Sequence, residues 1–101
     1  MQVFNLKTMK SYPYEDRHKN VFYKAKEFKT RIIELPPDGE MPICKMVSFV
    51  IFYAIKGTAE VKVNQEKIIL KEGQCLIVEP ATLSMKTQNG VKMMGIQIIK
   101  I

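Results

Sequence analysis

Histidine is nearly absent from this sequence: the 101 residues contain one, His18. A metal centre with several imidazole ligands, or a Ser-His-Asp or Cys-His catalytic group, would have to be built around that single residue. His18 lies in a basic, polar stretch with no neighbouring nucleophile, which is typical of a surface side chain. The sequence also lacks a glycine-rich phosphate loop, a Cys-x-x-Cys pair and a His-Glu-x-x-His motif, so the common signatures of nucleotide, redox and zinc-protease sites are missing.

Cysteine and long apolar runs are scarce as well. The two cysteines, Cys44 and Cys75, both lie in apolar, strand-like runs, which predicts two buried thiols, Cys44 pointing inward, rather than a disulfide. No apolar stretch approaches the roughly 20 residues that cross a bilayer. The first residues lack the apolar core of a signal peptide. We therefore expect a cytoplasmic chain that does not enter a membrane.

The positive charge is concentrated near the N-terminus. Residues 1–31 hold eight Lys/Arg and three Asp/Glu, whereas residues 32–101 hold eight and seven, for a total net charge of +6. A basic segment with interleaved aromatics can bind nucleic acid. However, fourteen of the sixteen cations are lysine, arginine dominates base readout, and no DNA-reading helix is visible. Nucleic acid is therefore disfavoured as a partner, and residues 1–28 are expected to form a basic segment that packs on the rest of the domain.

Short apolar stretches separated by turn residues predict an all-β chain with a single domain over residues 1–101. A short helical turn is expected near residues 14–19, after Pro13. The sequence Asn89-Gly90 is the strongest hairpin signal. The predicted strands cover residues 3–6, 21–23, 30–35, 48–56, 59–64, 67–71, 75–79, 83–88 and 91–100.

The stretch FVIFYAI, residues 49–55, is apolar on both faces. A period of two places Val50, Phe52 and Ala54 on one face and Ile51, Tyr53 and Ile55 on the other. A strand buried on both sides needs a second layer of cover. The N-terminal segment, with its short apolar stretch from Val3 to Leu6, is one source of that layer, and a second copy of the chain is another. We therefore expect a homodimer, with the N-terminal segment packed on its own barrel or exchanged between chains.

Residues 39–89 resemble the two sequence motifs of the cupin superfamily. The first motif, roughly G-x5-H-x-H-x3-4-E-x6-G, is matched by the glycines Gly39 and Gly57 and by the phrase IFYAIKG that ends at Gly57. The second, G-x5-P-x-G-x2-H-x3-N, is matched in outline by GQCLIVEPATLSMKTQ, from Gly73 to Gln88. The resemblance implies a cupin-type double-stranded β-helix, that is, a jelly-roll barrel.

The metal-ligating residues of those motifs are replaced in this chain. Aligned on the glycines, Val50 stands in place of the glutamate, Cys44 and Met46 in place of two histidines, and Ser84 in place of the last histidine. The other spacings place Ile43 and Lys45, or Met85, at these positions. Iron, manganese and nickel prefer imidazole and carboxylate ligands, so neither a metal nor another cofactor is expected. The alternative is a soft-metal site for Cu(I), built from Cys44 and Met46 with Met85 and Met94.

The resemblance also implies which side chains line the inside of the barrel, a pocket either filled by these side chains or open to a small apolar or singly anionic ligand. The leading hypothesis is a metal-free binding or structural module. The alternative is a cupin-type enzyme, either an isomerase or lyase using Lys86 or Cys44 or a redox enzyme with a soft metal. The predicted lining residues are Cys44, Met46, Val50, Phe52, Ser84, Lys86, Met94 and Ile96.

Overall fold

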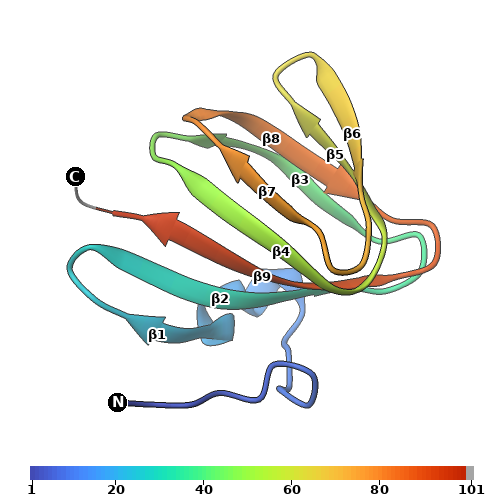
Figure 1. The fold of residues 1–101 in the computed structure, drawn as a ribbon. Coiled ribbons are helices and arrows are strands. Elements are labelled where there is room, and N and C mark those ends of the chain that lie inside the picture. The colour runs from blue at the N-terminus through green and yellow to red at the C-terminus, as the bar shows by residue number, and fades with distance from the viewer. Residues whose placement is uncertain (100–101) are drawn as a thin grey trace.

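Nine antiparallel strands and one short 3-10 helix make up the computed structural model, which describes residues 1–99 (Figure 1). The strands form two facing sheets, a five-stranded sheet in the order β1-β2-β9-β4-β7 and a four-stranded sheet in the order β3-β8-β5-β6. This is the predicted jelly-roll barrel. The elements are η1 (Tyr14–Asn20), β1 (Val21–Lys24), β2 (Phe28–Leu35), β3 (Glu40–Met46), β4 (Val50–Gly57), β5 (Ala59–Val63), β6 (Glu66–Leu70), β7 (Cys75–Val78), β8 (Ala81–Lys86) and β9 (Val91–Ile98).

The core lies between the two sheets and follows the period of two that the sequence shows. On β4, Val50, Phe52 and Ala54 are buried, and on β8 Leu83 and Met85 face them from the other sheet. Burial of these side chains is the main favourable contribution to folding. The period of two on β4 therefore separates the buried inner face from the outer face, which carries Ile51 and Tyr53.

Strand β3 was not among the predicted strands, although Cys44 was placed in a strand-like run. Its sequence contains Pro42, which has no amide hydrogen, and proline within a run argues against a central strand. In the structure β3 pairs only with β8, so it is an edge strand, where proline is tolerated. The pairing register shifts between Met41 and Cys44, which is a β-bulge at the proline. The bulge changes which side chains point inward, and this matters for the pocket described below.

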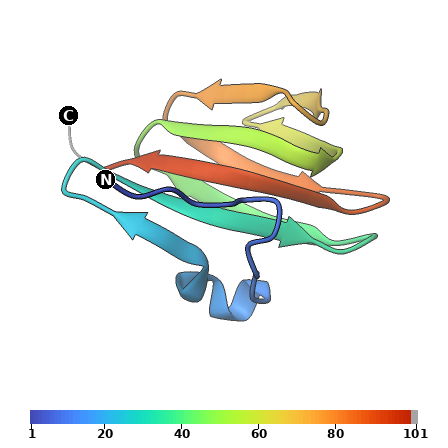
Figure 2. The same ribbon diagram turned by 60° about the horizontal axis from the view of Figure 1, so that its bottom comes forward.

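The predicted strand at residues 3–6 is absent, because this segment pairs with no sheet edge. It lies instead over the outer face of the five-stranded sheet (Figure 2), where the ring of Phe4 packs 4.9 Å from that of Phe22. The ammonium of Lys92 donates hydrogen bonds to the carbonyls of Lys7 and Met9 at 3.0 and 2.8 Å, which ties the segment to β9. Ile32 of β2 is 1% exposed yet lies outside the inner core, so the outer face of β2 is covered at this residue.

The cover stops before it reaches β4 and β7. On the outer face of these strands Tyr53 is 38% exposed and Ile77 is 66% exposed. Lys100, the predicted end of the last strand, lies outside the described residues. No helix among residues 1–99 is long and apolar enough to span a bilayer.

Candidate functional site

A pocket of about 330 Å³ opens into the barrel between the two sheets, and we call it the barrel pocket. Its floor is apolar, because Val50 and Phe52 of β4 and Leu83 of β8 form it. Of the eight lining residues that the sequence suggested, Cys44, Met46, Val50 and Phe52 line it. The full lining is Tyr14, Arg17, Arg31, Ile33, Met41, Cys44, Lys45, Met46, Val47, Val50, Phe52, Leu83, Gly95 and Gln97.

The β3 bulge brings sulfur atoms to one side of the pocket. Met41, Cys44 and Met46 all line it, although a regular strand would place Met41 and Cys44 on opposite faces. The thiol of Cys44 lies 3.6 Å from the thioether sulfur of Met46. This wall is therefore soft and polarizable rather than a set of charged ligands.

The other four suggested residues do not line the barrel pocket, and the reason is strand phase. On β8 the inward residues are Leu83 and Met85, so Ser84 and Lys86 point outward. On β9 Gly95 and Gln97 line the pocket, so Met94 and Ile96 lie on the outer face opposite Tyr53 and Ile51. Counting along the motif placed these side chains one residue out of phase, and a shift of one residue turns every side chain to the other face.

Polar residues that the motif comparison did not identify stand at the pocket. Arg31 comes from β2, Arg17 and Tyr14 come from η1, and Lys45 comes from β3. Gln97 joins them from β9, where its amide nitrogen donates to the hydroxyl of Ser48 at 3.4 Å. Within the described part of the chain no aspartate or glutamate lines the pocket, and the charged side chains that do are three cations.

Arg31 points into the barrel beside a glycine. A Cβ atom placed on Gly95 would lie 3.3 Å from the end of Ile33, 3.6 Å from the ring of Phe52 and 3.7 Å from Cγ of Arg31. Glycine at this position thus leaves room for the arginine stem against the apolar floor. Burial lowers the pKa of the Arg31 guanidinium, and the positive charge of Arg17 lowers it further. Arginine nevertheless stays protonated at neutral pH, so Arg31 is a partly desolvated cation.

Arg17 is held at the mouth of the pocket by its own helix. Its guanidinium lies 4.3 Å from the centre of the Tyr14 ring, a cation–π contact, and Nη1 donates to the carbonyl of Tyr14 at 3.1 Å. The side chain of Asn20, the last residue of η1, binds the backbone of Tyr12 just before the helix. It accepts from the amide of Tyr12 at 2.7 Å and donates to its carbonyl at 3.0 Å. Arg17 thus lines the pocket with one hydrogen bond to a backbone carbonyl, which leaves most of its guanidinium donors for other partners.

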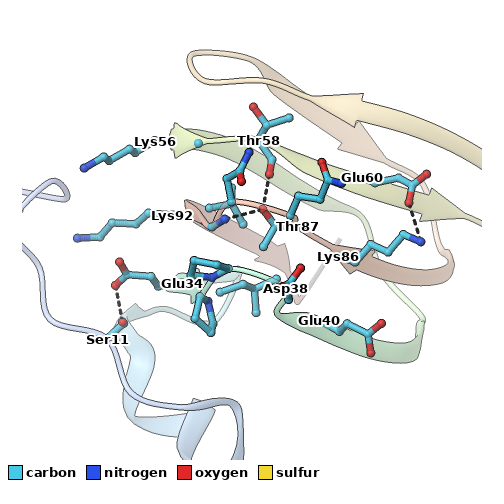
Figure 3. Close-up of a pocket in the computed structure, with 18 of the residues that line it drawn as sticks. Ser11, Glu34, Asp38, Glu40, Lys56, Thr58, Glu60, Lys86, Thr87 and Lys92 are labelled. Atoms are coloured by element: carbon cyan, nitrogen blue, oxygen red, sulfur yellow. Dashed lines mark hydrogen bonds and ion pairs between the residues drawn. The ribbon is translucent and has the colours of Figure 1, made fainter.

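A second hollow, about 1360 Å³ in volume, lies at the end of the barrel where the β2–β3, β4–β5 and β8–β9 connections meet (Figure 3). Five carboxylates and three lysines line this end hollow. Three contacts join polar groups across it: Ser11 donates to Glu34 at 2.7 Å, Lys86 pairs with Glu60 at 3.3 Å, and Thr87 donates to the carbonyl of Thr58 at 2.7 Å. We therefore interpret the end hollow as the solvated end of the barrel that fixes its turns.

Metal-binding donors are sparse in the part of the chain that the structure describes. No three His, Cys, Asp or Glu side chains of residues 1–99 lie close enough together to hold an ion. His18 is exposed on η1 and does not line the barrel pocket. A soft-metal site at the pocket would rest on Cys44 and the thioethers of Met41 and Met46, because Met94 points away and Met85 is buried in the core without lining the pocket.

Cys75 is exposed, and the prediction of a buried thiol was wrong. It lies on the edge strand β7 opposite Tyr53, on the outer face that the N-terminal segment leaves uncovered. An apolar run on an edge strand can be buried on one face only, and Cys75 lies on the other face. Cys44 is partly buried at the pocket, and both cysteines are free thiols.

We expect Cys75 to react with a bulky maleimide much faster than Cys44, because access of the reagent limits the rate at a partly buried thiol. The two rates are separated by labelling the Cys44→Ser and Cys75→Ser variants at sub-micromolar protein concentration and following the mass. Equal rates for the two thiols would contradict this placement.

No protein-family model and no curated protein sequence matches the chain. Solved structures do. An RmlC-like cupin protein from Desulfovibrio desulfuricans superposes with a TM-score of 0.82 at 13% identity, over 100% of this chain and 99% of that chain. A cupin superfamily protein from Desulfitobacterium hafniense gives 0.74 at 14% identity, over 79% and 74%. A variant of salicylate 1,2-dioxygenase from Pseudoaminobacter salicylatoxidans gives 0.68 at 16% identity, over 72% and 21%. Likeness at these identities establishes the cupin fold alone.

Proposed function

We propose that this cupin-fold chain is a binding protein that holds a small molecule in its barrel pocket without a metal ion. The observation that carries the proposal is the open pocket itself: about 330 Å³ of space with an apolar floor and polar groups on its walls. Ligand sites in proteins have this character and begin at about this size, roughly 300 Å³. A structural module would be expected to fill such a space with its own side chains.

The enzyme alternative has less support at this pocket. Lys86, one candidate for an isomerase or lyase, pairs with Glu60 at the end hollow and does not reach the barrel pocket. Cys44 does line the pocket, but among residues 1–99 no histidine or carboxylate lines it to act as a base. Binding a ligand therefore requires only the groups already present at the pocket, whereas catalysis by Cys44 would also require a base.

Shielding of Cys44 tests the binding proposal. In the Cys75→Ser variant, we expect at least one of four one-ring probes (benzamide, benzoate, phenol and cyclohexanol) to slow maleimide labelling of Cys44, because Cys44 lines the pocket. The matched control is Cys75 in the Cys44→Ser variant, whose labelling rate should stay the same with every probe. If none of the probes protects Cys44 up to its solubility limit, the proposal is wrong.

Metal content tests the metal-free part of the proposal. Cys44, Met46 and Val50 stand where the cupin resemblance places three of the metal ligands, and all three line the pocket. Ser84 stands at the fourth ligand position but points outward, and its neighbour Leu83 lines the pocket instead. Protein dialysed against a chelator should retain less than about a tenth of an equivalent of iron, manganese, nickel or zinc. Iron, manganese and nickel prefer imidazole and carboxylate ligands, and a zinc site needs more than the single thiolate that Cys44 could supply. Elemental analysis of the dialysed protein measures this content, and one retained equivalent of any of these metals would overturn the metal-free proposal.

A further inference from the structure

The two arginines of the chain, which carries fourteen lysines, both line the barrel pocket. They come from separate elements, Arg31 from β2 and Arg17 from η1. Arg31 is partly buried and Arg17 is exposed, so one guanidinium lies inside the pocket and the other at its mouth. Both guanidinium groups of the chain, each planar with five N–H donors, therefore belong to one pocket.

Neither arginine is neutralised by a carboxylate within residues 1–99, where the single ion pair joins Lys86 and Glu60. The side-chain hydrogen bonds in the same range give Arg17 one carbonyl partner and give Arg31 none. A partly desolvated guanidinium beside another positive charge is unfavourable for the empty protein, as the lowered pKa of Arg31 also reflects. An anion entering the pocket would remove that cost.

The shape and chemistry of the pocket restrict the anion. The floor of Val50, Phe52 and Leu83 is apolar and offers nothing to a bare inorganic ion, but it suits an apolar body attached to the charge. The volume of about 330 Å³ admits one ring or a short branched chain rather than a nucleotide. A guanidinium fork matches the two oxygens of a carboxylate, with two parallel N–H···O bonds.

We propose that the ligand of the barrel pocket is a small organic carboxylate, whose carboxylate is bound by Arg31 with Arg17 at the mouth and whose apolar body lies on Val50, Phe52 and Leu83. This inference rests on the proposed binding function and adds the chemical class of the ligand. It also assigns to Arg31 the role of main recognition residue, because its guanidinium is the more buried of the two.

Benzoate and benzamide distinguish charge from shape, since they are planar and nearly the same size but only benzoate is an anion. By calorimetric titration we expect the wild-type protein to bind benzoate about tenfold or more tightly than benzamide, as charge-assisted hydrogen bonds to a desolvated cation are strong. Arg31→Gln should bring the two affinities within about threefold of each other. Lys62→Gln is the matched control, because it removes the same charge from an exposed position on β5 and should leave the preference intact.

Folding of the variants is checked by thermal melting. Arg31→Gln should melt no lower than the wild type, because the guanidinium it removes has no carboxylate partner among the described residues. If it does unfold, Arg31→Lys keeps the charge without the fork and is expected to lose most of the preference for benzoate. An Arg31→Lys protein with the full preference would show that a point charge suffices, and would overturn the role assigned to the fork.

The outcomes separate this inference from the function on which it rests. If benzamide protects Cys44 and binds as tightly as benzoate, the pocket binds small molecules but the carboxylate assignment is wrong. If no probe protects Cys44, the binding function itself fails. If inorganic phosphate binds as tightly as benzoate, the apolar floor contributes nothing, and the site recognises an anion without an organic body, which also overturns the proposal.

Discussion

Gly57→Ala should lower the free energy of unfolding by about 3 kcal/mol or more, from two separate causes. Gly57 ends β4 with φ of +83°, a conformation that costs an L-residue roughly 1–2 kcal/mol. In addition, a Cβ atom at this position would overlap the carbonyl oxygen of Gly90 and lie 3.0 Å from Cα of Val91. Those neighbours are backbone atoms of the β8–β9 turn and β9, so the overlap cannot be relieved by a side-chain rotation.

Gly73→Ala provides the matched control. Gly73 has the same φ of +83°, but a Cβ atom there would meet nothing within 4 Å. Its cost should therefore be the conformational part alone, about 1–2 kcal/mol. Chemical denaturation followed by circular dichroism gives both values. Equal losses in the two variants would mean that β4 and the β8–β9 turn move apart at little cost, and that their close approach does not hold the barrel closed.

The fold was predictable because its signals are local. A period of two on β4 separates Val50 and Phe52 from Ile51 and Tyr53, the cupin resemblance assigns the first pair to the interior, and turn residues such as Asn89-Gly90 separate the strands at the observed places. The side chains of the pocket were predictable only where they lie on such a strand or on the motif that precedes it. The prediction that Ser84 and Met94 line the pocket was wrong, because a count from distant glycines cannot detect a shift of one residue. The burial of Leu83 and Met93 shows which residues of each strand point inward.

The two arginines differ in how far the sequence predicts their place at the pocket. On β2 Arg31 shares a face with Ile33 and Leu35, so a period of two places it inside the barrel. That signal was present in the sequence, but a charged side chain is ordinarily assigned to the surface. Arg17 lines the same pocket only because η1 packs against the barrel, and nothing local in the sequence predicts that packing. The inward turn of Met41 likewise depends on the bulge at Pro42.

Tyr53→Lys should convert a dimer of this chain into a monomer. We propose that two copies pair through the part of the outer face that the N-terminal segment leaves open, on β4 and β7. Tyr53, Ile77 and Cys75 are exposed there, and Ile51 lies between them partly exposed. Covering Tyr53 and Ile77 would remove on the order of 200 Å² of apolar surface from water per chain, worth about 5 kcal/mol before entropic costs. A lysine at the centre would place two like charges across that interface.

Ile69→Lys is the matched control, because Ile69 is 52% exposed on β6 of the other sheet and receives the same kind of change. Sedimentation of the wild type and of Ile69→Lys should show dimers at tens of micromolar, and Tyr53→Lys should stay a monomer. Cys75 reports on the same event, since its labelling should slow with rising concentration in the wild type but not in Tyr53→Lys. A wild type that remains monomeric, with labelling of Cys75 independent of concentration, would mean that the N-terminal segment covering β2 and β9 is all the cover this sheet has.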